Sequence, residues 1–242
     1  MGKTKNHSAR KRRNVQGEKK RFILIKTAAK LFSQRGYFDA SINDIAKLAG
    51  TKTSAIIYHF DTKKNLFHTT IKYYFLNLAK LDTIFDYFDY NDADNNPQIF
   101  GEALYNSANH LLTILFDEKK KIPYLSGLVS TLLVDARDQI DTEIRNICYN
   151  ATNKLIDKLR ILRPELSENK LYWARQFYWA MVLYSIFGNK FILCDIGAER
   201  KYPREFLDAY AYRITIGICK LLDLPYPEKI GESWVYNKKR LV

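Results

Sequence analysis

The chain has 242 residues, of which 47% are hydrophobic, so it is long enough to bury a sizeable core. It contains only 10 Gly and 6 Pro, and its apolar residues lack strand-type alternation, which predicts an all-α fold. The longest largely apolar run, residues 177–187, is far shorter than the roughly 20 residues that cross a bilayer. No secretory signal is visible, so we expect a cytoplasmic protein without a membrane partner.

Catalytic and metal-binding patterns are missing. Cys148, Cys194 and Cys219 are widely spaced in apolar runs and are expected to be reduced core thiols. There is no Gly-rich phosphate loop, paired-Cys motif, HExxH or GxSxG. We therefore expect neither an enzyme nor a cofactor or metal site.

The positive charge is concentrated at one end of the chain. Residues 1–67 hold 16 Lys and Arg against 4 acids, a net +12, whereas residues 68–242 hold 23 against 22, a net +1. A basic region confined to one small domain indicates a polyanionic partner. Binding through such charges should weaken steeply with salt.

Residues 1–20 are basic and lack apolar periodicity, which predicts a disordered basic arm. This arm could be a solvated tail, or it could contact DNA through residues 10–13; the sequence leaves both alternatives open. A helix is expected over residues 21–35, with Leu24, Ala28, Leu31 and Phe32 on one face and Gly36 at its end.

Residues 41–60 predict two short helices joined by a turn, a shape that fits the major groove of DNA. Ser41 is placed to cap the first of these helices, and Gly50 supplies the positive φ that the turn needs. The second helix, from about residue 53 to 59, buries Ile56 and directs polar side chains outward.

The segment ILIKTAAKLFSQRGYFDASINDIAKLAG, followed by YHF, a turn with a Lys, and NLF, resembles the DNA-binding domain of TetR/AcrR-type transcriptional regulators. The resemblance covers roughly residues 23–67. It implies a helix-turn-helix DNA-binding domain at 21–67 and a helical effector-binding and dimerisation domain at 68–242.

By this resemblance, Tyr58 and His59 contact phosphates, Lys63 contacts a phosphate at the next helix, and Thr53 and Ser54 touch bases. Lys52, Ser54 and Ile57 differ from residues common in the family, and Ile57 could touch a thymine methyl group. The full set expected to contact DNA is Ser41, Lys52, Thr53, Ser54, Ile57, Tyr58, His59 and Lys63.

The fourth helix is expected to run as one rod from residue 62 to about 90, and further helices are expected at 97–116, 122–136, 140–161, 167–194 and 203–222. The helix at 167–194 is apolar nearly all round, so one side should face its own core and the other a second subunit. Together with the helix at 203–222 it should form the interface of a homodimer, which would bind a palindromic operator.

We interpret the protein as a repressor that a small-molecule effector of unknown identity releases from double-stranded DNA. The alternative is an architectural or activating DNA-binding protein without an effector. Aromatic and polar side chains could line the effector cavity, although any one of them is more often an ordinary core residue. The candidates are Tyr105, His110, Phe116, Tyr124, Tyr149, Trp173, Phe177 and Tyr184.

Overall fold

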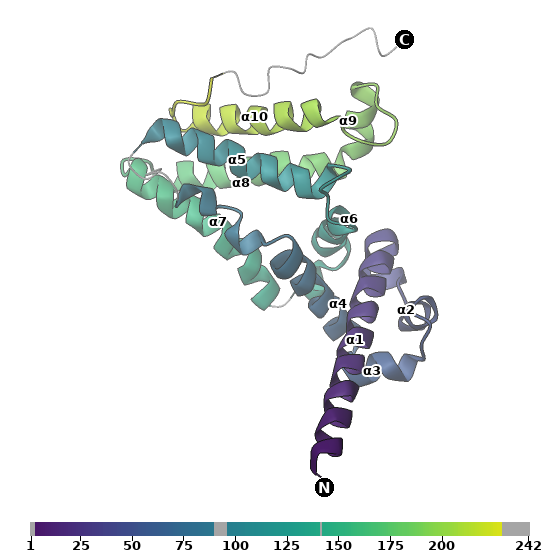
Figure 1. Cartoon of the computed structure of the whole chain (residues 1–242). Coiled ribbons are helices and arrows are strands. Elements are labelled where there is room, and N and C mark those ends of the chain that lie inside the picture. Colours follow the sequence, from purple (N-terminus) through teal and green to yellow (C-terminus); the bar gives the residue numbers. More distant parts are fainter. Residues whose placement is uncertain (1–2, 90–95, 141, 229–242) are drawn as a thin grey trace. The chain divides into compact units, whose positions relative to one another are not determined.

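The computed structural model describes residues 3–89, 96–140 and 142–228 (Figure 1). These residues form helices and no strands, which confirms the all-α prediction. The chain divides into two compact units. Unit 1 comprises Met1–Asn77 and Gly127–Ile144, and unit 2 comprises Leu78–Ser126 and Arg145–Val242.

Unit 1 contains the first four helices and a segment from the middle of the chain. The helices are α1 (Lys3–Asp39), α2 (Ile42–Leu48), α3 (Thr53–Phe60) and α4 (Lys63–Lys72), which continues as a π-helical turn (Tyr73–Leu78). The middle segment contains the end of α6 (Leu125–Ser130), a π-helical turn (Thr131–Asp135), a 3-10 turn (Arg137–Gln139) and the start of α7 (Thr142–Leu162).

The apolar face predicted for the first helix is its core face. Leu24, Ala28, Leu31 and Phe32 are at most 5% exposed, and α1 is interrupted at Gly36, where φ is 80° and ψ is 179°. The structure differs from the prediction before residue 21, because α1 begins at Lys3 where a disordered arm was expected. Lys, Arg, Ala and Glu are good helix formers, and a packed helix extends more easily than a new one nucleates.

The middle segment packs against α1 and α4, so unit 1 is larger than the predicted 21–67 domain. The Thr131 hydroxyl donates to the Phe32 carbonyl over 2.8 Å, and His68 Nε2 lies 2.6 Å from the Gln139 carbonyl. The Asp135 carboxylate accepts hydrogen bonds from the backbone N–H groups of Tyr37 and Phe38. The boundary therefore falls after residue 77, and 127–144 belongs with the first helices.

The predicted rod from residue 62 to 90 is wrong. The regular α-helix ends at Lys72, and Lys80 adopts a left-handed φ of 48° that breaks the helix direction. Two 3-10 turns follow, Leu81–Thr83 and Asp86–Phe88. Asp residues recur in this stretch, and Asp disfavours helix interiors because its side chain competes for backbone hydrogen bonds.

Unit 2 is built around the pair α5 (Pro97–Phe116) and α10 (Arg204–Leu221), with α8 (Glu168–Phe187) packed against both. The predicted bounds of α5 are confirmed, and those of α10 are right to within one residue at each end. The predicted helix at 167–194 is wrong as one element, because it bends by 78° at Gly188 between α8 and α9 (Asn189–Asp195). A Cβ at Gly188 would lie 2.6 Å from the Tyr184 ring, so a larger residue at this bend would force the ring to move.

Of the cysteines, Cys219 is buried as expected, but Cys194 is exposed, because α9 turns it away from the core. The side chain of Cys148 lies outside what the structure describes. No single described helix combines the length and apolar composition of a membrane span; α8 and α9 do so only as a bent pair.

Candidate DNA-binding interface

The two helices predicted over residues 41–60 are α2 and α3 of unit 1. The Ser41 hydroxyl caps α2 by accepting from the Asp44 N–H over 3.0 Å, and the same hydroxyl donates to the Asp44 carboxylate. Gly50 has a φ of 62°, which lets the chain turn tightly between the helices. Ile56 and Phe60 are buried on the inner side of α3, so the opposite side of this helix faces solvent.

The exposed side of α3 carries several of the predicted contacts. Tyr58 is 85% exposed, with its ring edge-on to that of His59, and Ile57 is 45% exposed, so both side chains are accessible to a partner. Ser54 is also exposed. Lys52 occupies the cap position of α3, where an ammonium group cannot accept a capping hydrogen bond, and its side chain is exposed.

Three other predicted contacts have partners within unit 1. The Thr53 hydroxyl donates to the Asn43 side chain over 2.9 Å and so joins α3 to α2. The Lys63 ammonium donates to the Phe38 carbonyl over 3.0 Å and lies 4.7 Å from the centre of the Tyr37 ring. Ser41 is the cap of α2. Each would have to share or exchange a hydrogen bond to reach DNA.

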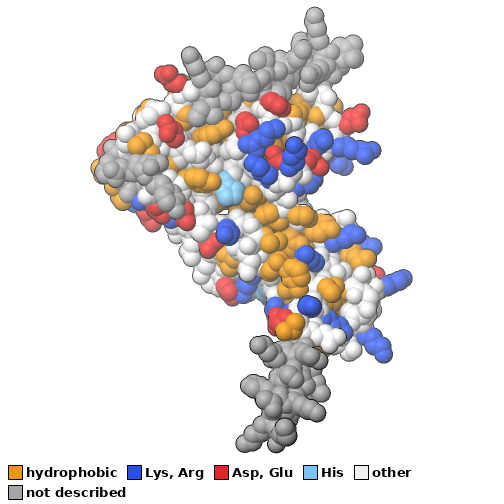
Figure 2. All heavy atoms as spheres, viewed as in Figure 1, with side chains coloured by type: hydrophobic (Ala, Val, Ile, Leu, Met, Phe, Trp, Pro, Cys, Tyr) orange, Lys and Arg blue, Asp and Glu red, His pale blue; other side chains and the backbone are white. Residues whose placement is uncertain are grey.

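Electrostatics of the interface are dominated by cations. Burial lowers the pKa of His59, and the positive charges of Arg21 and Lys20 lower it further, which favours the neutral imidazole in the DNA-free protein. Burial also lowers the pKa of Lys63, a shift that the charges of Asp135 and Asp39 oppose. In Figure 2, Lys and Arg side chains stand out on the surface of unit 1 over the region of α2 and α3.

Sequence reasoning did not identify several residues that shape this interface. Asn43 orients Thr53 from the preceding helix; its only sequence signal is an exposed polar position on α2. Asp135 holds the end of α1, 98 residues earlier in the chain, and no local pattern could have shown this. Gly17 and Lys20 lie beside α3 because α1 extends further back than expected.

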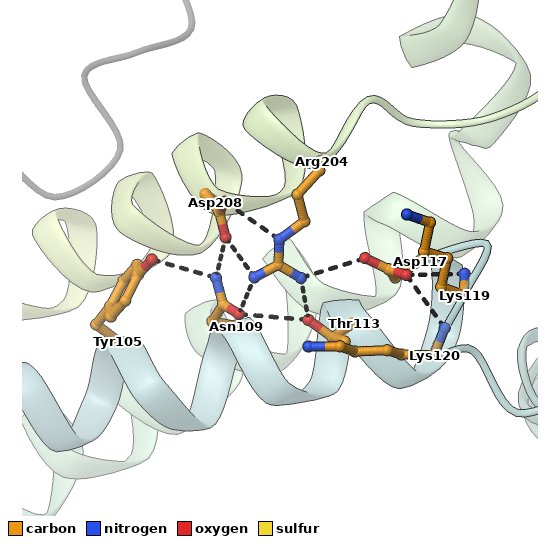
Figure 3. A network of polar contacts seen from close by, with 8 residues as sticks. All are labelled: Tyr105, Asn109, Thr113, Asp117, Lys119, Lys120, Arg204 and Asp208. Atoms are coloured by element: carbon orange, nitrogen blue, oxygen red, sulfur yellow. Dashed lines mark hydrogen bonds and ion pairs between the residues drawn. The ribbon is translucent and has the colours of Figure 1, made fainter.

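The eight residues predicted to line an effector cavity do not line a common cavity within the described parts of unit 2; only Trp173, Phe177 and Tyr184 lie together, on α8. Tyr105, on α5, accepts a hydrogen bond from Asn109 at one end of a polar network that joins α5 to α10 through Arg204 (Figure 3). His110 pairs with the Tyr87 hydroxyl at 3.1 Å, and the Phe116 ring packs against Tyr202.

The remaining candidates are largely exposed. Tyr124 lies in a turn with a φ of 68°, and Tyr149 is on the surface of α7. Trp173, Phe177 and Tyr184 project from the outer face of α8, and each is about half exposed. Phe177 and Tyr184, with Met181, line an open and mostly apolar groove between α8 and α10.

Two short helices with a tight turn, a basic surface and an exposed aromatic-bearing second helix define a helix-turn-helix DNA-binding protein. The family model of the bacterial regulatory proteins, tetR family, matches residues 24–70. The negative transcriptional regulator IcaR of the biofilm operon icaADBC from Staphylococcus aureus is 38% identical over 190 residues, covering 76% of this chain and 91% of IcaR. The chain therefore belongs to the TetR family of transcriptional regulators.

Solved structures agree on the fold. A TetR-family regulator from Marinobacter aquaeolei VT8 matches with a TM-score of 0.57 at 16% identity, covering 89% of this chain and all of that chain. NalD, the secondary repressor of the MexAB-OprM multidrug efflux pump in Pseudomonas aeruginosa, matches with a TM-score of 0.54 at 16% identity, covering 91% of this chain and 100% of NalD. At this identity the likeness concerns the fold alone.

Proposed function

We propose that the protein is a repressor that binds a palindromic double-stranded operator as a homodimer, with α3 in the major groove. The exposure of Tyr58 and Ile57 on α3, beside the exposed Lys52 and Ser54, is the observation that carries this proposal. Repression, rather than activation or an architectural role, is supported by the likeness to IcaR, a negative regulator.

Within this proposal, Tyr58 and His59 donate to phosphates, and Lys52 supplies charge at the start of α3. Ser54 and Ile57 read base edges, while Thr53 does so if it exchanges its bond to Asn43. Lys63 is the least available contact, because its ammonium is held by the Phe38 carbonyl. Ser41 acts through the cap of α2 more than through its own contact with DNA.

The dimer would form through the outer face of α8 together with α10. Four aromatic side chains on this face are each about half exposed, and a monomer rarely leaves so much contiguous apolar surface uncovered. They are Trp173, Phe177, Tyr184 and Phe187. A second copy of the same face would bury them around a two-fold axis.

The effector would bind unit 2. The Tyr178 hydroxyl is fully buried and has no hydrogen-bond partner among the described residues, which is an unfavourable state that a ligand with an acceptor group could relieve. To release the operator, the effector must bind the DNA-free conformation more tightly. A compound that raises the melting temperature of the protein and weakens operator binding would have these properties.

Replacement of Tyr58 by Ala tests the proposal. The operator is first selected from random duplex DNA with the wild-type protein, and its affinity for both proteins is measured at physiological salt. We expect Tyr58→Ala to weaken binding to all duplexes by roughly tenfold, since a charge-assisted phosphate contact contributes about 1.5 kcal/mol. Equal affinity of the variant and the wild type would mean that α3 is not the reading helix.

A further inference from the structure

A groove lies beside the exposed side of α3 in unit 1, and one of its walls comes from the first part of α1. Its lining includes Gly17 and Lys20 of α1, Thr51 and Lys52 of the turn, and Tyr58 and His59 of α3. The family model begins at residue 24, so this wall precedes the part of the chain that the family domain accounts for.

Helix geometry explains why this part of α1 faces α3. At about 100° per residue, Gly17 and Lys20 lie within about 40° of Leu24 around the helix axis. Leu24 is fully buried in the core of unit 1, whereas the same face one and two turns earlier carries Lys and Gly. A Cβ added at Gly17 would have no atom within 4 Å, so this end of the groove is open.

The groove is cationic. Among the described residues, its lining contains Lys20 on one wall and Lys52 on the other, and no Asp or Glu. Both lysines are exposed. The charges of Arg21 and Lys20 act at His59 in the direction that lowers its pKa, after burial, while that of Glu18 acts more weakly in the opposite direction. A strand carrying negative charge would therefore be attracted into the groove.

Building on the proposed DNA-binding function, we propose that the sugar-phosphate backbone of the operator occupies this groove, held between Lys20 on α1 and Lys52 at α3. Tyr58 and His59 belong both to the groove and to the exposed side of α3, so a backbone that contacts them runs directly into it. The extended α1 is then a second DNA-binding element, and the operator contact is wider than the helix-turn-helix alone provides.

The test compares Lys20→Ala with Lys26→Ala on the selected operator duplex. Lys26 lies on the same helix but about 200° from Leu24, on the side away from the groove, and it is exposed. Affinity is measured between 0.1 and 1 M salt. Loss of one phosphate contact should reduce the slope of log affinity against log salt by about 0.9, which amounts to roughly eightfold weaker binding at 0.1 M if nothing is lost at 1 M.

A second pair of variants, Lys20→Glu and Lys26→Glu, reverses the charge at the same two positions and leaves the helix intact. We expect Lys20→Glu to weaken binding more than Lys20→Ala, because the groove would then repel a phosphate, and Lys26→Glu to have a much smaller effect. Thermal melting of each variant establishes that the rest of unit 1 is folded.

The inference is overturned if Lys20→Ala behaves like Lys26→Ala, or if Lys20→Glu binds as tightly as Lys26→Glu. The Tyr58→Ala variant separates this failure from that of the proposed function. If Tyr58→Ala weakens binding and Lys20→Ala does not, only the groove is wrong. If the wild type selects no DNA, both the proposed DNA-binding function and the proposed backbone contact in the groove are wrong.

Discussion

Ser41 and Ser54 were both expected to contact DNA, but their hydroxyl groups have different surroundings. The Ser41 hydroxyl accepts from the Asp44 backbone N–H and donates to the Asp44 carboxylate, which also binds Arg35. Ser54 is exposed beside the open groove. The first serine therefore contributes to stability, and the second is free to contact DNA.

The paired variants Ser41→Ala and Ser54→Ala should separate these roles. Removing the cap of α2 should lower the free energy of unfolding by about 1 kcal/mol, whereas a surface change at Ser54 should stay within about 0.5 kcal/mol. Urea unfolding measures both values, and DNA selection with each variant measures base preference. The assignment fails if Ser54→Ala is the less stable variant or if only Ser41→Ala changes the selected bases.

The sequence predicts the position of an individual side chain well where a local pattern of residues determines that position. The cap at Ser41, the turn at Gly50 and the inward position of Ile56 all follow from spacing within one helix-turn-helix. The partners of Thr53 and Lys63 could not be predicted, because each depends on how side chains pack across two helices. Both are residues that family resemblance alone would have assigned directly to DNA.

At the scale of elements, the end of α1 shows how a distant residue can fix a local turn. Gly36 has a φ of 80° and a ψ of 179°, a conformation that is essentially restricted to glycine, and a Cβ there would lie 2.6 Å from the Asp135 carboxylate. Gly50 also has a positive φ, but a Cβ there would meet nothing within 4 Å. The two glycines thus differ in their region of φ/ψ space and in the space available for a Cβ atom.

We therefore expect Gly36→Ala to destabilise the protein more than Gly50→Ala. Both variants carry the cost of a positive φ, but Gly36→Ala also displaces Asp135 from the two backbone N–H groups it accepts, adding about 1 to 3 kcal/mol. Thermal unfolding of the two variants under the same conditions gives the comparison. An equal or larger loss for Gly50→Ala would show that the Asp135 contact does not support this turn.

The outer face of α8 is the proposed dimer interface, and a charged substitution there tests it. Phe177→Glu places a charge in the apolar groove between α8 and α10, where a second subunit would have to bury it. We expect a shift from dimer to monomer at micromolar concentration, measured by light scattering after size exclusion.

Ile161→Glu is the matched control. Ile161 is 57% exposed on α7, outside the lining of the groove, and the same charge there should leave the dimer intact. A dimer that persists in Phe177→Glu, or that dissociates equally in both variants, would contradict the proposed interface.

Among the elements, those with clear start and stop signals were predicted well. Asn96 and Pro97 mark the start of α5, and Ser167 caps α8 by accepting from the Lys170 N–H. The bend at Gly188 was missed because the apolar pattern continues through it. The end of α4 was missed because the apolar residues of the next stretch, Phe85 and Phe88, bury against the core through 3-10 turns and not along one helix.

At the scale of the whole molecule, the chain passes between the two units at three places, after Asn77, after Ser126 and after Ile144. The sequence predicts only one connection between the DNA-binding domain and the rest of the chain, the long helix that starts at residue 62. Nothing in the local sequence of 127–144 indicates that it packs with α1 and α4, since its contacts join residues that are 71 to 99 positions apart. A change in unit 2 therefore has more than one covalent route to the helices that hold α3.

In the proposed complex, two copies of α3 read an operator with two-fold symmetry. Selection of binding sites from random duplex DNA with the full-length wild-type protein tests it directly. We predict an inverted repeat whose half-site centres are separated by about 10 base pairs or a multiple of that, the spacing of major grooves on one face of the duplex. Enrichment of a single unrepeated site, or of no sequence at all, would contradict the account.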